Sequence, residues 1–236
     1  MHPLKSLYLV AAALTLGGCA SQPAVPPPEI AGIEQSAAIT VNDLRPKVEG
    51  EKEIFSLMIT SDAYAIYRVP DDATKPTGPR LLAHRAFEKF PELKDQPKID
   101  VRHFVTYANL QSTLRKNTLI GVFTGPLIGT AIISQQEFPV SEVRTTEIDS
   151  QAFENSGGSE EYTRAYFTAE ENPSKSPVNV IYMDTDMLGK RIASRCLVPP
   201  VAGKPNLFLV EAFDMCIANH LALYGGKNPV PDTAAK

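Results

Sequence analysis

The first residues of the chain decide where it folds, and therefore which kinds of fold are open to it. Lys5 precedes an uncharged apolar run at residues 7–16, and Gly17 and Gly18 then lead to Cys19. A run of about ten residues is too short to cross a hydrocarbon core of ~30 Å, so it predicts a secretory signal and not a membrane-spanning helix. We therefore expect residues 1–18 to be removed as a signal peptide and the rest of the chain to fold after export.

The end of this signal carries a modification pattern. The tetrapeptide LGGC, which ends at Cys19, resembles a bacterial lipobox. The resemblance implies cleavage between Gly18 and Cys19, a diacylglycerol on the Cys19 sulfur and an acyl chain on its amine, and no other cofactor. Several acyl chains on one residue are sufficient for stable membrane attachment. Ala20 and Ser21 follow in place of an aspartate, which in such lipoproteins implies an outer-membrane location facing the periplasm. The alternative is a plain secretory signal with an accidental cysteine.

Two further cysteines are present, Cys196 and Cys216. The periplasm is oxidising, so a single pair of cysteines predicts a disulfide between them. The bond would close a loop of about 21 residues, worth roughly 3 kcal/mol of unfolding free energy in the chain-entropy model. The alternative is two separate buried thiols. Because there is no Cys-x-x-Cys motif, the pair does not indicate a redox centre or a zinc site.

Composition and local bias divide the chain into a tether, one domain and a tail. Residues 22–28 read QPAVPPP, which favours polyproline II, so residues 19–36 are predicted to be the lipidated cysteine and its tether. Residues 37–226 are predicted to form a single domain, because 43% of the chain is hydrophobic and 21% is charged. Residues 227–236 are predicted to be a loose tail. The formal net charge of −4, with no basic run longer than two residues, argues against nucleic-acid binding.

Hydrophobic patterning predicts several strands. The segments rich in β-branched or aromatic residues are 38–42, 54–60, 63–69, 99–107, 162–168 and 178–183. Strict alternation along residues 99–107 predicts one shared face for four side chains: Ile99, Val101, His103 and Val105.

Two other segments carry the period of an amphipathic helix. The first is opened by Gly78 and Pro79 and stopped by Pro91. The second is capped by Asn206 and ends at Tyr224, before a pair of glycines. Because strands and helices do not alternate strictly, the predicted fold class is α+β, with a mostly antiparallel sheet and one or two packed helices.

The order of these features resembles that of small YajG-like outer-membrane lipoproteins. The shared features are a lipobox, a tether, a first strand that leads to Asp43-Leu44-Arg45, then a helix, a further strand and a late helix. The resemblance implies the same placement and a similar fold. The biochemistry of such families is unassigned, so it implies no activity.

One internal segment has an unusual composition. Residues 117–136 contain no charged residue, and Gly121, Gly125 and Gly129 stand four positions apart. On a helix these glycines would share one face, as in paired membrane helices, which predicts a membrane-contacting or self-associating element. The apolar centre, residues 119–133, is shorter than the ~20 residues of a membrane span, and Pro126 interrupts it. These two features favour a buried strand–turn–strand, and both interpretations stay open.

The sequence shows no recognisable catalytic or metal-binding motif. Asp184 and Asp186 are interpreted as caps of a weak helix at residues 187–195 and not as cation ligands. The glutamate pairs at 160–161 and 170–171 are interpreted as solvated faces. Three histidines remain after signal removal and are interpreted as core or boundary residues: His84, His103 and His220.

The sequence therefore predicts a non-enzymatic, lipid-anchored envelope lipoprotein with a periplasmic binding or structural domain. Its expected partners are the membrane, through the lipid, and another envelope protein, and its oligomeric state is left open. One alternative is a membrane-associated assembly subunit that uses the glycine-containing segment. A second is a small-ligand binding protein or hydrolase, which a deep polar cleft containing His103 or Asp184 would favour.

Overall fold

A computed structural model describes most of the chain after the predicted tether. The described residues are 30–112, 114, 143–156, 158–173, 177–198 and 208–225. The predicted lipidation and cleavage residues, Cys19 and Gly18, lie outside these ranges. The same holds for the glycine-containing segment with Gly121, Gly125 and Gly129, so neither interpretation of that segment is tested.

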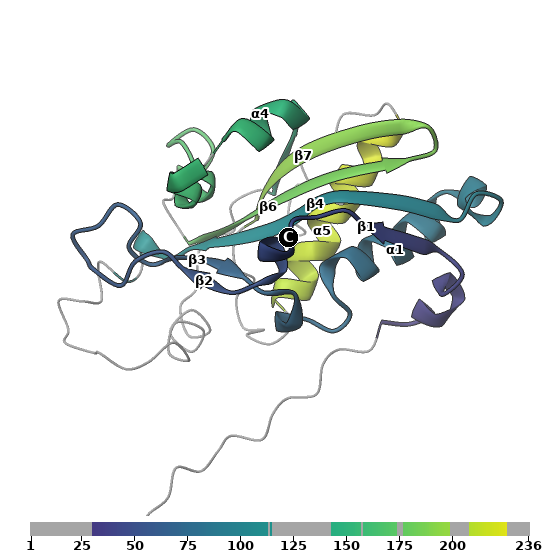
Figure 1. The fold of residues 1–236 in the computed structure, drawn as a ribbon, viewed down its shortest axis with the longest axis horizontal. Helices are drawn as coiled ribbons and strands as arrows, with labels where there is room; N and C mark the ends of the chain where they lie inside the picture. Colours follow the sequence, from purple (N-terminus) through teal and green to yellow (C-terminus); the bar gives the residue numbers. More distant parts are fainter. Residues whose placement is uncertain are drawn as a thin grey trace, which may run out of the picture.

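The centre of the fold is a seven-stranded sheet in the order β2-β3-β4-β6-β7-β5, with β1 also paired to β4 (Figure 1). Every pairing is antiparallel except that of β1 with β4, which is parallel. The predicted α+β class with a mostly antiparallel sheet is thus confirmed. The strands are β1 (Thr40–Asp43), β2 (Glu53–Ile54), β3 (Ile66–Val69), β4 (Lys98–Asn109), β5 (Arg144–Ile148), β6 (Val178–Met187) and β7 (Lys190–Val198).

Helices cover both faces of the sheet. The two long helices, α1 (Gly78–Lys89) and α5 (Phe208–Tyr224), pack on one face and enclose the larger hydrophobic core. The short helix α4 (Ser150–Asn155) and the 3-10 helix Gly158–Ala165 lie over the other face, above a smaller core (Figure 1). Among the described residues, no helix combines the length and apolar character needed to span a membrane. Four more 3-10 helices complete the described elements: Ile33–Ser36, Lys47–Gly50, Asp71–Ala73 and Pro91–Lys94.

The predicted helices at both ends of the domain are present, and Asn206, the predicted cap of the second, lies outside the described residues. The first runs from Gly78 to Lys89 with Pro79 in its first turn, as expected. Gly78 has a second reason to be a glycine, because a Cβ atom there would lie 2.2 Å from Cε1 of Phe104. The close approach lets α1 pack directly on β4.

Strand β4 changes face at a bulge. The register with β6 shifts between Val101 and His103, and this shift breaks the alternation that the sequence predicts. Ile99 and Val101 face the α1/α5 core, whereas Val105 belongs to the core on the opposite face. The prediction of one shared face for Ile99, Val101, His103 and Val105 is therefore wrong, and the bulge turns His103 away from the long helices.

Three other predicted elements are wrong. Of the strand predicted at residues 54–60, only Ile54 lies in a named strand, β2. Residues 162–168 begin within the 3-10 helix Gly158–Ala165, where Ala165 packs into the smaller core, and not in a strand. The weak helix predicted at residues 187–195 is instead strand β7, and Asp184 and Asp186 lie within β6 and cap nothing. A two-residue turn at Leu188 and Gly189, both with positive φ (53° and 74°), joins these strands into a hairpin.

Cys196 on β7 and Cys216 on α5 lie at disulfide distance, with their Cα atoms 5.8 Å apart. Both residues are fully buried in the larger core. The pair ties the C-terminal helix to β7, the strand next to the β5 edge of the sheet, as the cysteine count predicts.

The N-terminal side of the domain begins earlier than the predicted boundary. The 3-10 helix Ile33–Ser36 lies in the range assigned to the tether, yet Ser36 is fully buried. Its Oγ lies 3.0 Å from Nδ1 of His84 and accepts a hydrogen bond of 2.9 Å from Arg80. Residues 33–36 are therefore part of the folded domain.

Candidate functional site

The site begins at a gap along one edge of β4. On this edge β1 pairs with Lys98–Val101 and β3 pairs with Thr106–Asn109, while β6 occupies the other edge. Phe104 lies between the two partners. Its N–H donates to Oε2 of Glu49 at 3.2 Å, and its carbonyl accepts from Nη1 of Arg45 at 3.0 Å. Two side chains from the β1–β2 connection thus satisfy the backbone groups that a neighbouring strand would otherwise bind.

Arg45 anchors this connection. Its Nε and Nη2 donate to the two carboxylate oxygens of Asp43 at 2.9 and 2.8 Å, and Nη2 also donates to Asp71 at 2.7 Å. The guanidinium is almost fully enclosed, with 7% of the side chain exposed. Its hydrogen bond lowers the pKa of the Asp43 carboxyl below the ordinary value. The Asp-x-Arg tripeptide therefore has a structural role in this chain.

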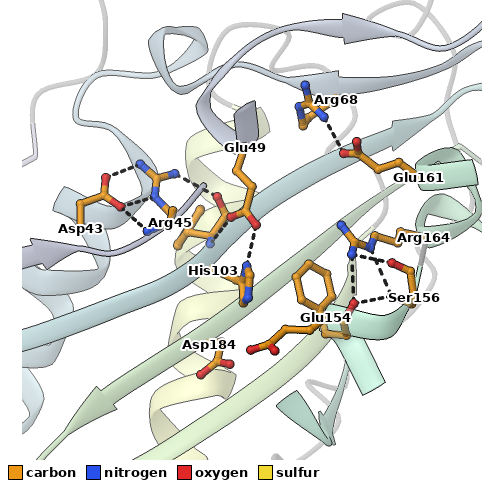
Figure 2. Close-up of polar contacts among 12 residues, drawn as sticks. Asp43, Arg45, Glu49, Arg68, His103, Glu154, Ser156, Glu161, Arg164 and Asp184 are labelled. Atoms are coloured by element: carbon orange, nitrogen blue, oxygen red, sulfur yellow. Dashed lines mark hydrogen bonds and ion pairs between the residues drawn. The ribbon is translucent and has the colours of Figure 1, made fainter. Parts of the chain in front are cut away.

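Glu49 connects the gap to His103. Its Oε1 lies 2.5 Å from Nδ1 of His103, while its Oε2 holds the Phe104 amide (Figure 2). The two side chains are 5% and 12% exposed. An ionised carboxylate only accepts hydrogen bonds, so the proton of this contact is carried by Nδ1 of His103. The pair fixes the orientation and tautomer of the imidazole before any ligand arrives.

The opposite wall is built by α4 and the 3-10 helix that follows it. The Arg164 guanidinium lies 4.1 Å from the centre of the Phe153 ring, and the His103 ring lies 4.5 Å from it in an edge-on arrangement. Arg164 also donates to the carbonyl oxygens of Phe153 and Ser156, at 2.9 and 2.6 Å. These contacts hold Arg164 in place and cover the aromatic ring.

Two glutamates complete the wall. Glu161 Oε1 accepts from Nη1 of Arg68 at 2.5 Å and from the Tyr107 hydroxyl at 2.7 Å. Burial raises the pKa of Tyr107, so its phenol remains a donor at neutral pH. Glu154 is 45% exposed and lies 3.4 Å from Nη2 of Arg191.

Together these side chains line a pocket of about 240 Å³ that is open to solvent. It lies on the face of the sheet away from the long helices (Figure 2). Three carboxylates and one guanidinium are the formally charged groups of its lining when His103 is neutral. The lining residues are Pro46, Val48, Glu49, His103, Phe153, Glu154, Glu161 and Arg164.

The three histidines are separated by the sheet. His103 lines the pocket, whereas His84 on α1 and His220 on α5 are fully enclosed on the opposite face. Asp184 does not line the pocket but lies beside it: its Oδ2 accepts from Nη2 of Arg191 at 2.6 Å, and the same nitrogen faces Glu154. The structure therefore brings His103 into a polar site and leaves the other two as core residues.

Sequence reasoning missed most of the site. Glu49, Glu154 and Arg164 belong to no recognised pattern, and Glu161 was expected on a solvated face, where the structure instead pairs it with Arg68. The available signal is the Asp-x-Arg tripeptide, which lies four residues before Glu49 and marks the connection that fills the β4 gap. Among the residues that the structure describes, no group of three or more His, Cys, Asp or Glu side chains is placed to hold a metal ion.

Comparisons with known proteins found no match to this chain among family models, curated proteins or solved structures.

Proposed function

We propose that the chain is a lipid-anchored envelope protein, attached through Cys19, whose periplasmic domain binds a small ligand in the pocket at His103. The signal, the LGGC tetrapeptide and the Pro-rich tether support the anchored location. The pocket supports ligand binding, because its lining is polar and includes His103. We therefore favour small-ligand binding over a purely structural role for the domain.

One observation carries the binding proposal. His103 is held from behind by Glu49, itself bound to the backbone of β4, and lines the pocket with its remaining ring nitrogen uncommitted to any described protein group. Arg164 and Glu161 are held in the same way by neighbouring side chains and carbonyls. Groups that are already fixed lose little conformational entropy on binding, which favours affinity in a small site.

The same pair favours a second candidate function. A histidine whose Nδ1 is bound to a carboxylate can take a proton at Nε2, so Glu49 and His103 could activate a water as a general base. Under this reading the protein would be a hydrolase. A substrate turned over by the purified chain, with loss of turnover but not of binding in His103→Gln, would support it.

The expected contact with another envelope protein stays a prediction. Apolar side chains in the β2–β3 connection are available for it, since Leu57 is 77% and Met58 is 68% exposed. The alternative of an assembly subunit built on Gly121, Gly125 and Gly129 also stays a prediction.

The three histidines provide a direct test of ligand binding. The full chain, labelled at the histidine ring carbons and purified in detergent, would be titrated with a small-molecule extract of cell envelopes and followed by NMR. We expect the His103 resonances to shift, because this ring lines the pocket, while those of His84 and His220 remain unchanged across the sheet.

The variant His103→Gln assigns the resonance. If neither the extract nor a general fragment library shifts His103, the binding proposal is wrong. Equal shifts at all three histidines would indicate a global effect and would also contradict binding at the pocket.

A further inference from the structure

The β2–β3 connection carries a concentrated apolar surface. Eight large hydrophobic side chains are exposed in the described part of the chain, and half of them lie within residues 54–59. These four side chains, the apolar tip, are Ile54, Leu57, Met58 and Ile59. Leu57 is 77% and Met58 is 68% exposed. Neighbouring exposed apolar side chains, unlike scattered ones, indicate a contact surface.

The composition of this connection suits a lipid surface. Residues 54–61 carry no charged side chain, so insertion of the tip would bury no charge. Two tyrosines lie close to it in the chain or in space. Tyr64 is half-buried, and Tyr166 is 38% exposed, with its hydroxyl donating to the Asp62 carbonyl at 3.1 Å. Tyrosine is enriched where the apolar part of a membrane meets water, so aliphatic residues flanked by tyrosines are typical of a segment at that interface.

The backbone of the tip is already hydrogen-bonded. The Met58 N–H donates to Oγ of Ser56 at 3.1 Å, and the Met58 carbonyl accepts from the N–H of Ser61 at 2.9 Å. The Ala65 N–H donates to the Ser56 carbonyl at 3.3 Å and closes the connection. Backbone groups that enter lipid must find partners within the protein, and these groups have them. The apolar side chains are therefore presented by a loop that loses few hydrogen bonds to water on insertion.

The tip and the tether lie at opposite ends of the domain (Figure 1). Strand β1, which follows the tether, pairs with the start of β4 at Lys98, and β3, which follows the tip, pairs with its end at Asn109. The twelve residues of β4 span about 40 Å. The chain between Cys19 and Ile30 reaches at most about 40 Å. A domain anchored at Cys19 thus stays within about its own length of the bilayer, and the tip reaches the surface when β4 lies along it.

The size of the tip favours lipid over a protein partner. A stable protein–protein interface takes about 20–30 residues from each side, whereas the tip has four. Contact with the bilayer requires less, because the anchor makes this second contact intramolecular and raises its effective concentration. Four apolar side chains are therefore sufficient for a membrane contact that accompanies a lipid anchor.

We propose that the apolar tip inserts into the same lipid surface that holds Cys19, so that the domain contacts the bilayer at both ends of β4. Leu57 and Met58, the most exposed of the four side chains, enter deepest. The inference rests on the proposed function, because it takes the anchorage at Cys19 as given, but it does not depend on a ligand in the pocket at His103. Binding of the tip to a protein is an alternative that the test distinguishes.

The test uses tryptophan fluorescence. The chain contains no tryptophan, so a single introduced tryptophan reports on one position. The full chain carrying Met58→Trp is purified in detergent and reconstituted into phosphatidylcholine vesicles with or without brominated acyl chains. Bromine quenches tryptophan on contact, while flotation with the vesicles reports anchorage separately. We expect the emission of Met58→Trp to shift to shorter wavelength and to lose intensity in the brominated vesicles.

Leu44→Trp provides the matched control. Leu44 is also an exposed leucine, at 47%, but it lies between the charged residues Asp43 and Arg45. We expect the fluorescence of Leu44→Trp to be the same in both kinds of vesicle, because charged neighbours keep this position in water.

Further substitutions test the remaining side chains of the tip. Adding Leu57→Ser and Ile59→Ser to Met58→Trp should reduce the ratio of inserted to free tip at least tenfold, seen as loss of the quenching. Adding Leu44→Ser to Met58→Trp should leave the quenching unchanged. These positions are exposed, so the substitutions should not affect folding, which far-UV circular dichroism checks.

The outcomes separate the tip from the anchor. If the chain floats with the vesicles but Met58→Trp is not quenched, the inference is wrong and the anchorage stands. Equal quenching of Met58→Trp and Leu44→Trp would also overturn the inference, since the contact would not be specific to the tip. If the emission of Met58→Trp shifts only when envelope proteins are added, or only as the concentration of the chain rises, the tip binds a protein and not lipid. If the chain does not float, the anchorage and this inference both fall.

Discussion

His220 should make the domain sensitive to acid. The residue is fully buried on α5, with Nε2 2.7 Å from Oγ1 of Thr185 and Nδ1 2.8 Å from Oγ of Ser194. Burial lowers its pKa from the ordinary value of 6.5 to about 3, since removal from water disfavours the charged imidazolium. Asp184 opposes this shift and Lys89 adds to it, and both effects are smaller than that of burial.

The sign of the effect follows from proton binding. Between pH 6.5 and about 3 the unfolded chain takes up a proton at His220 and the folded protein does not. The contribution of neutral His220 to the unfolding free energy is therefore fully present above pH 6.5, and it is lost progressively as the pH falls toward 3. Acidification from pH 6.5 to 4.5 therefore removes about 2 kcal/mol of unfolding free energy through this one residue.

The measurement is urea unfolding at pH 6.5, 5.5 and 4.5, followed by far-UV circular dichroism on a secreted form in which Cys19 is replaced by serine. His220→Gln serves as the comparison, because glutamine does not titrate and the remaining acidic groups are the same in both proteins. We expect His220→Gln to lose about 2 kcal/mol less than the parent between pH 6.5 and 4.5. Parallel losses in the two proteins would refute the reasoning, since His220 would then not be held neutral in the folded state.

Three other substitutions test separate features. Replacing Cys196 and Cys216 together by alanine should lower the unfolding free energy by about 3 kcal/mol, seen as a lower urea midpoint that no longer responds to reductant. Gly78→Ala should cost about 1–3 kcal/mol, because the added Cβ lies 2.2 Å from the Phe104 ring; an unchanged melting temperature would mean that α1 can move away from β4. Cys19→Ala should abolish metabolic labelling with a palmitate analogue and release the protein from membranes, and labelling that persists would place the lipid elsewhere or nowhere.

The parts of the fold that the sequence predicts well are those specified by local signals. Helix α1 follows from Pro79 in its first turn and Pro91 beyond its end. Helix α5 ends at Tyr224, before a pair of glycines, as expected. The Cys196–Cys216 pair follows from the predicted oxidising compartment and the number of cysteines alone. In each case a few neighbouring residues, or one chemical rule, are sufficient.

The errors arise where tertiary structure overrides such signals. The β6–β7 hairpin turns at Leu188, which has a positive φ that leucine rarely adopts. The first position of the turn therefore lacks the asparagine, aspartate or glycine that usually identifies such a turn in a sequence. Tyr162 lies in an aromatic segment with strand propensity, yet it packs beside the smaller core from a 3-10 helix.

The site was beyond prediction for a related reason. Glu49, His103 and Arg164 come from three segments separated by more than 50 residues each, and they meet only because β4 bulges and its edge is interrupted. A single sequence does not show that residues so far apart along the chain lie close together in the fold. His103 could be named as a candidate, but its carboxylate partner could not.

The gap in β4 has a consequence for how the domain fluctuates. Most amides along this twelve-residue strand can exchange with solvent only if a neighbouring strand separates. The Phe104 amide is held instead by the side chain of Glu49, so a change of one rotamer is enough to free it. Its hydrogen–deuterium exchange should therefore proceed by a local opening while its neighbours wait for global unfolding. The same carboxylate also holds His103, which lines the pocket. The exchange rate of the Phe104 amide should therefore differ between the empty and the ligand-bound pocket.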